Sequence, residues 1–262
     1  MNKYFLLISL SITLFACKKI INVDLNNAPP QLVIEGLVND VNPATITISK
    51  SVIFSSSNTF PSVSGAFVTI KDNVGNTYTL SESSSVPGTY TTSAIIGKSG
   101  RTYTLNVNVN GAIYTAISSM PALVNLDTIL PDQIAFGSKI LKVVTPIFTD
   151  PPGLGNYYQL VEKVNSRLLK NVNAWNDNVN DGGTNTRRLI YSDDVDSLNI
   201  KKGDTVTVEM RCIDKNIFNY MYALADLSSS QTTPSNPVSN ISNGALGYFS
   251  AHTSRQKKIV MP

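Results

Sequence analysis

The stretch that decides the fold is residues 101–116, RTYTLNVNVNGAIYTA. Positions 102–109 alternate polar and apolar side chains, the period of a β-strand whose successive side chains point to opposite faces of a sheet. Asn110 and Gly111 follow this run, and both suit the positive φ angles that the central positions of a type I′ turn require. The stretch therefore predicts a β-hairpin.

Shorter runs of the same kind precede the hairpin, at residues 31–38, 44–52, 66–71, 77–80 and 89–91. Turn-forming residues separate them, for example Pro87-Gly88. Short strands at this regular spacing are typical of a β-sandwich of the immunoglobulin or transthyretin kind, and the pattern leaves both topologies open. We expect such a sandwich domain over residues 31–125.

The second half predicts a further β-rich domain over residues 126–262, with strands at 139–149, 156–164, 204–214 and 246–251. Val206, Val208, Met210 and Cys212 share one face of the third of these strands, so Cys212 is expected in the core. Residues 214–227 instead carry apolar side chains at helical spacing behind Asp214, a suitable N-cap. The chain is therefore expected to be all-β with one short helix.

The N-terminus has the parts of a secretory signal: Lys3, an apolar run at 4–15 and the small residue Ala16. The run is shorter than the roughly 20 residues that span a bilayer. Residues 14–17, LFAC, match the bacterial lipobox, in which the chain is cut between Ala16 and Cys17 and the cysteine carries acyl chains such as palmitate. The sequence predicts a lipoprotein signal peptide over residues 1–16 and a lipid-anchored tether over 17–30.

Composition argues against several functions. The 21 Lys and Arg nearly balance the 18 Asp and Glu, and no basic stripe appears, so nucleic acid is not an expected partner. His252, the single histidine, and Cys212 are too few for a zinc site, and Cys212 has no partner for an intramolecular disulfide once Cys17 is lipidated. His252 is expected on the surface or at an interface. Since neither a G-x-S-x-G elbow nor a P-loop is present, no catalytic residue and no cofactor are predicted.

The most suggestive polar segment is residues 171–196, which holds many carboxylates and amides beside Trp175, the only tryptophan. Asp177 and Asp181 offer oxygen ligands of the kind that calcium prefers, but Val179 and Arg188 break the pattern of an EF-hand loop that starts at Asp177. Trp175 could stack on a sugar, although anchoring a core is the commoner role of tryptophan. Trp175, Asp177 and Asp181 are the candidate ligand-binding residues, and no metal is predicted.

Several short motifs keep a defined order along the chain: LVIEG at 32–36, SGAFVTI at 64–70, PGTY at 87–90, GRTYTL at 100–105, TDPPG at 149–153, NYY at 156–158, KGD at 202–204 and GALGYF at 244–249. In this order the chain resembles a lipoprotein family of the Bacteroidota known as domain of unknown function 4249. The resemblance implies outer-membrane lipoproteins, often encoded beside TonB-dependent receptors, without an established activity or catalytic residues.

These features favour a non-enzymatic accessory or scaffold lipoprotein at the outer membrane, with a TonB-dependent receptor as partner in nutrient uptake. Two alternatives stay open: a surface adhesive or structural module, and a hydrolase whose carboxylate pair the pattern does not reveal. Surface-exported lipoproteins of that phylum often carry acidic residues after the lipidated cysteine. Lys18 and Lys19 stand there instead, which favours the periplasmic face of the outer membrane.

Overall fold

The computed structural model describes residues 29–53, 59–137, 139–191, 200–229 and 236–262. In this part of the chain the fold is all-β with one helix, as the sequence predicts. The expected signal peptide, Cys17 and most of the expected tether lie outside the described residues. Among the described residues, no helix is long and apolar enough to cross a membrane.

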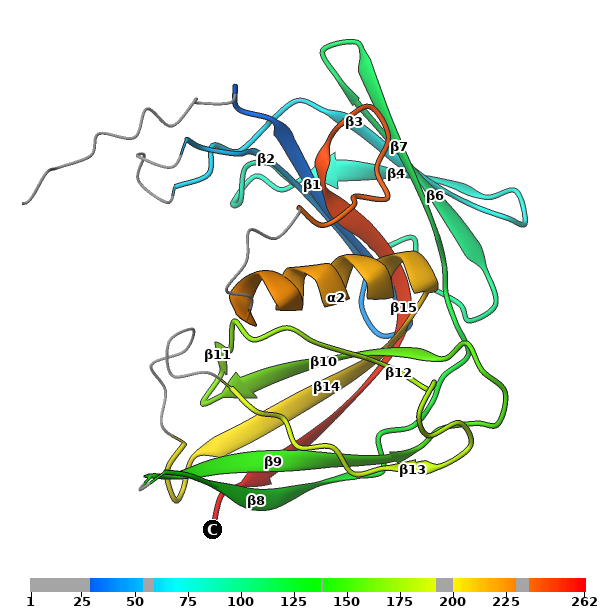
Figure 1. Cartoon of the computed structure of the whole chain (residues 1–262). Coiled ribbons are helices and arrows are strands. Elements are labelled where there is room, and N and C mark those ends of the chain that lie inside the picture. Colours follow the sequence, from blue (N-terminus) through cyan, green and yellow to red (C-terminus); the bar gives the residue numbers. More distant parts are fainter. Residues whose placement is uncertain (1–28, 54–58, 138, 192–199, 230–235) are drawn as a thin grey trace, which may run out of the picture.

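Figure 1 shows the order of the elements. They are β1 (Leu32–Asn39), β2 (Ala44–Lys50), β3 (Phe67–Asp72), β4 (Thr77–Glu82), β5 (Thr89–Thr92), β6 (Thr102–Val109), β7 (Ala112–Ser119), β8 (Thr128–Phe136), β9 (Lys139–Thr149), β10 (Tyr157–Val164), β11 (Arg167–Leu168), β12 (Asn173–Asn176), β13 (Thr184–Asn185), β14 (Thr205–Ile213), α2 (Lys215–Ser229) and β15 (Leu246–Val260). We call the part built on β1–β7 the first unit and the part built on β8–β14 the second unit.

The C-terminal strand β15 joins the two units (Figure 1). Its first half pairs parallel with β1, and its second half pairs antiparallel with β14. One sheet therefore runs through both units, in the order β11-β10-β14-β15-β1-β2-β5-β4-β3-β6-β7, while β13, β9 and β8 form a second sheet. The sequence predicts only residues 246–251 of β15. The basic residues that follow do not show a strand pattern, and they form a strand because they pair with β14.

The predicted hairpin at residues 101–116 is confirmed. Strands β6 and β7 pair along their whole length, and the φ angles of 50° at Asn110 and 88° at Gly111 fit the predicted turn. Tyr103, Leu105 and Val107 are buried in the core of the first unit. Ile241, Ala245, Phe249 and Ala251 complete this core, although a division of the chain at residue 125 assigns them to the other domain.

The core of the second unit contains Cys212, which is 2% exposed, so its predicted core position is confirmed. Strand β8 was not predicted because Pro131 interrupts its pattern. The structure tolerates this proline since β8 lies at the edge of its sheet, where β9 is its one partner among the described strands.

The helix α2 begins where the sequence predicts. The Oδ1 atom of Asp214 accepts the backbone N–H of Ile217 at 3.0 Å, which confirms the N-cap. Ile217, Phe218 and Met221 then pack against Tyr157 and other side chains of the sheet. Figure 1 shows the helix crossing the middle of the molecule, beside the stretch where β15 passes from one unit to the other.

Candidate functional site

Three aspartates meet at one end of the second unit. Asp150 follows β9, Asp177 follows β12, and Asp181 lies in the turn before β13. Strand β13 pairs with the end of β9, and β12 pairs with β10, so the loops at 150–156 and 177–183 are brought side by side. One carboxylate oxygen of each aspartate lies within 4.8 Å of the other two. The sequence indicated Asp177 and Asp181, while Asp150 was missed because its loop joins theirs only in the folded chain.

The carboxylates cross-link the two loops through backbone N–H groups. Asp177 Oδ2 accepts hydrogen bonds from Gly155 at 2.7 Å and Asn156 at 2.8 Å. Asp181 Oδ1 accepts one from Gly153 at 2.6 Å, and Asp150 Oδ2 accepts one from the N–H of Gly182 at 3.2 Å. The positive φ angles of Gly153 and Gly155, 112° and 117°, let the backbone turn these N–H groups inward.

Burial sets the chemistry of this cluster. Asp150 and Asp177 are 4% and 3% exposed, whereas Asp181 is exposed. The hydroxyl of Tyr158 donates a hydrogen bond to Asp150 Oδ1. Burial, this hydrogen bond and the charge of Asp150 raise the pKa of Tyr158 above its ordinary value, so the hydroxyl stays protonated and remains a donor. Asp177 Oδ1 is buried and has no hydrogen-bond partner among the described residues.

Trp175 and Asp177 line one small cavity beside the cluster, with a volume of about 20 Å³. Such a volume holds a water molecule or an ion, and it has no room for a sugar ring. Trp175 is half-buried, packs against the core of the second unit and carries the guanidinium of Arg187 over its ring, 5.8 Å from the centroid. The tryptophan therefore has a packing role here.

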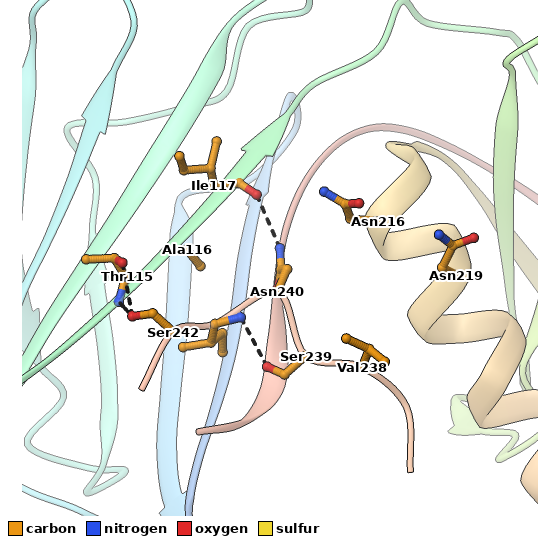
Figure 2. A pocket seen from close by; sticks show the side chains of 10 residues that line it. Thr115, Ala116, Ile117, Asn216, Asn219, Val238, Ser239, Asn240 and Ser242 are labelled. Carbon is orange, nitrogen blue, oxygen red and sulfur yellow. Dashed lines mark hydrogen bonds between the residues drawn. The ribbon is translucent and has the colours of Figure 1, made fainter. Parts of the chain in front are cut away.

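A larger groove lies between β7, the start of α2 and residues 238–242 (Figure 2). It has a volume of about 490 Å³. Figure 2 shows Asn216 on the helix opposite Ile117 and Asn240. Asn240 holds one wall together, since its Nδ2 donates to the carbonyl of Phe249 at 2.8 Å and to that of Ile117 at 3.3 Å.

The lining of this groove suits binding. In the part that the structure describes, it consists of amides, hydroxyls and aliphatic side chains, with no acidic, basic or histidine residue. Asn216 and Asn219 are exposed on the helix, and Ile117 and Val238 are 58% and 84% exposed. This groove was not predicted from the sequence. The two asparagines three positions apart on one helix face were a readable signal, but only the fold places them opposite β7.

The single histidine was expected on the surface or at an interface, and the surface position is wrong because the side chain is buried. His252 lies in β15, where the two units meet, and is 1% exposed. Its Nδ1 lies 3.2 Å from the hydroxyl of Ser250, which is also buried. Burial and the charge of Arg211 lower the pKa of His252 to about 3, so the ring is neutral at physiological pH. A substrate has no access to a side chain in this position.

The model of the family described as domain of unknown function (DUF4249) matches residues 18–258. No curated protein matches the chain.

Proposed function

We propose that this chain, which belongs to the DUF4249 family, is a non-enzymatic, lipid-anchored accessory protein that binds a partner at the outer membrane in the service of TonB-dependent nutrient uptake. The lipobox at Leu14–Cys17 supports the anchor. From Cys17 to residue 30, an extended tether of this length reaches at most about 45 Å. The body is thereby held where a membrane receptor can meet it.

The groove between β7 and α2 carries this proposal. Ile117 and Val238, which line it, are exposed aliphatic side chains at 58% and 84%, and Ile113, at 58%, is a further exposed aliphatic residue of β7. Neighbouring exposed aliphatic residues with a polar surround are typical of protein interaction surfaces. The groove is walled by β7 of the first unit and by α2, which packs on β10 and β12 of the second unit. A partner seated in it would therefore contact the first unit and the helix that covers the second.

Uncharged polar groups give the groove its selectivity. The exposed amides of Asn216 and Asn219 can each donate and accept hydrogen bonds, as the backbone of an extended protein segment requires. Among the described residues that line it, none carries a carboxylate or imidazole for acid–base chemistry. The groove therefore supports recognition of a polypeptide better than it supports catalysis.

The test is an affinity capture of the tagged, lipidated chain from detergent-solubilised outer membranes, followed by mass spectrometry. We expect a TonB-dependent receptor at a stoichiometric amount, and a reduced amount with the anchor variant Cys17→Ala. Ile117→Asp should abolish capture, because it buries a charge in the interface without a partner.

The matched control is Ile140→Asp on β9. Ile140 is exposed to 63%, a value close to that of Ile117, and does not line the groove. If the Ile117→Asp and Ile140→Asp variants capture equal amounts of the receptor, the groove is not the binding surface. Recovery of no receptor at all would contradict the uptake role.

A further inference from the structure

The three aspartates of the second unit carry more negative charge than their neighbours neutralise. Asp150 and Asp177 are nearly fully buried. Among the described residues, no lysine or arginine forms an ion pair with either of them or with Asp181. Arg187 lines the adjoining cavity, but its guanidinium lies over the ring of Trp175. Buried carboxylates without a paired cation are costly, so this cluster lacks a positive partner.

The unsatisfied oxygen of Asp177 is an independent sign that something is missing. Asp177 Oδ2 accepts two backbone N–H groups, whereas Asp177 Oδ1 is buried without a hydrogen-bond partner among the described residues. Buried polar atoms in folded proteins nearly always have a partner. Asp177 also lines the cavity of about 20 Å³, which has room for one ion or water molecule.

The separation of the carboxylates fits a calcium ion. One oxygen from each of Asp150, Asp177 and Asp181 lies within 4.8 Å of the others. Calcium binds oxygens at 2.3–2.6 Å, so oxygens on opposite sides of the ion are about 4.6–5.2 Å apart. Magnesium is disfavoured because it keeps several of its waters and is usually bound through only one or two carboxylates. Zinc is disfavoured because the site offers no nitrogen or sulfur ligand.

We propose that Asp150, Asp177 and Asp181 bind a calcium ion, with water completing its coordination. The ion would tie the loop at 150–156 to the loop at 177–183, adding to the hydrogen bonds that already join them. The site lies apart from the groove between β7 and α2 and shares no residue with it. Neither proposal depends on the other.

The first measurement is a terbium titration of the full-length chain after chelation of bound metal. Terbium takes calcium sites, and Trp175, the only tryptophan, lines the same cavity and should sensitise its luminescence. We expect saturable luminescence that CaCl₂ reverses at much lower concentration than MgCl₂. The titration should reach millimolar CaCl₂, since sites in extracellular modules have Kd values of about 10⁻⁴–10⁻³ M.

Two variants locate the site. Asp177→Asn and Asp181→Asn keep a side-chain oxygen and remove one charge each. We expect each variant to weaken metal binding by at least about tenfold, because even changes to residues that only contact the ligands of a metal typically cost about 10–100-fold in affinity. The matched control is Asp226→Asn, an exposed aspartate on α2, which should bind as the unchanged chain does. Circular dichroism checks that each variant folds, and the exposed Asp181 makes Asp181→Asn the safer of the two.

Two results would overturn the proposal. The first is a metal-free chain that shows no saturable terbium luminescence and no change in melting temperature with CaCl₂. The second is a folded Asp181→Asn variant that binds calcium as tightly as the Asp226→Asn control.

Discussion

The hydroxyl of Ser118 donates a hydrogen bond to the carboxylate of Asp214. The same carboxylate caps α2 through the N–H of Ile217, and Ser118 Oγ in turn accepts the N–H of Ala251 at 2.8 Å. A single aspartate thus connects β7 of the first unit, the helix and β15. This connection fixes the helix that forms one wall of the groove.

Replacing Asp214 with alanine should destabilise the chain by more than the loss of a helix cap. A cap contributes about 1 kcal/mol, and leaving the buried hydroxyl of Ser118 without its acceptor costs roughly 1–3 kcal/mol more. Urea unfolding measures the difference in the free energy of unfolding. The control Asp214→Asn keeps an acceptor oxygen and should lose much less. Equal losses in the two variants would show that the hydrogen bonds of Asp214 do not stabilise the fold.

Gly247 should not tolerate a side chain. It has a φ angle of 91°, and a Cβ atom there would lie 2.1 Å from the carbonyl oxygen of Ile34 in the paired strand β1. Gly75, at a φ angle of 99°, has open space around the same position. Gly75→Ala should cost only the backbone strain of about 1–2 kcal/mol, while Gly247→Ala should cost about 2 kcal/mol beyond that. Similar melting temperatures for the two variants would contradict the close packing of β15 on β1.

His252 should make the chain less stable as the pH falls below 6.5. Its pKa is about 3 in the folded chain, where burial and Arg211 oppose protonation more than Glu209 and Asp40 favour it, and about 6.5 when unfolded. A folded pKa below the unfolded value gives stability that is present above pH 6.5 and is lost below it. At pH 5 the loss should be on the order of 2 kcal/mol.

Urea unfolding at pH 7 and pH 5 measures this loss, and His252→Gln is the control because it cannot take up the proton. The chain has one histidine, so no other histidine titrates in this window. A loss of the same size in His252→Gln would assign the pH dependence to other groups.

Cys212 should be inert in the folded chain. The thiol is buried in the core of the second unit, and burial raises its pKa, so little thiolate forms and reagents have no access. In the variant Cys17→Ala, a thiol reagent should give no signal under native conditions and one thiol per chain in denaturant. A fast native reaction would mean that this core opens readily.

Local features of the sequence were enough for the class of fold and for many of its elements. The alternation at 101–116 with Asn110-Gly111 predicted the β6–β7 hairpin, and Asp214 ahead of apolar residues at helical spacing predicted α2. These predictions succeed because strand alternation, turn conformation and helix capping depend on residues that are close together in the chain. The same alternation placed Cys212 in the core.

The tertiary structure alone decided which segments meet. The alternation of polar and apolar residues tells which face of a strand is buried, but it does not identify the strand that pairs with it. The pairing of β1 with β15, which are far apart in the chain, therefore had no local signal in the sequence. That pairing buries His252. The strand pairings that set the two loops side by side bring Asp150 to Asp177 and Asp181, and the packing of α2 opposite β7 creates the groove. The sequence therefore determined the elements and their buried faces, while the candidate sites exist only because distant loops and edges come together when the sheets form.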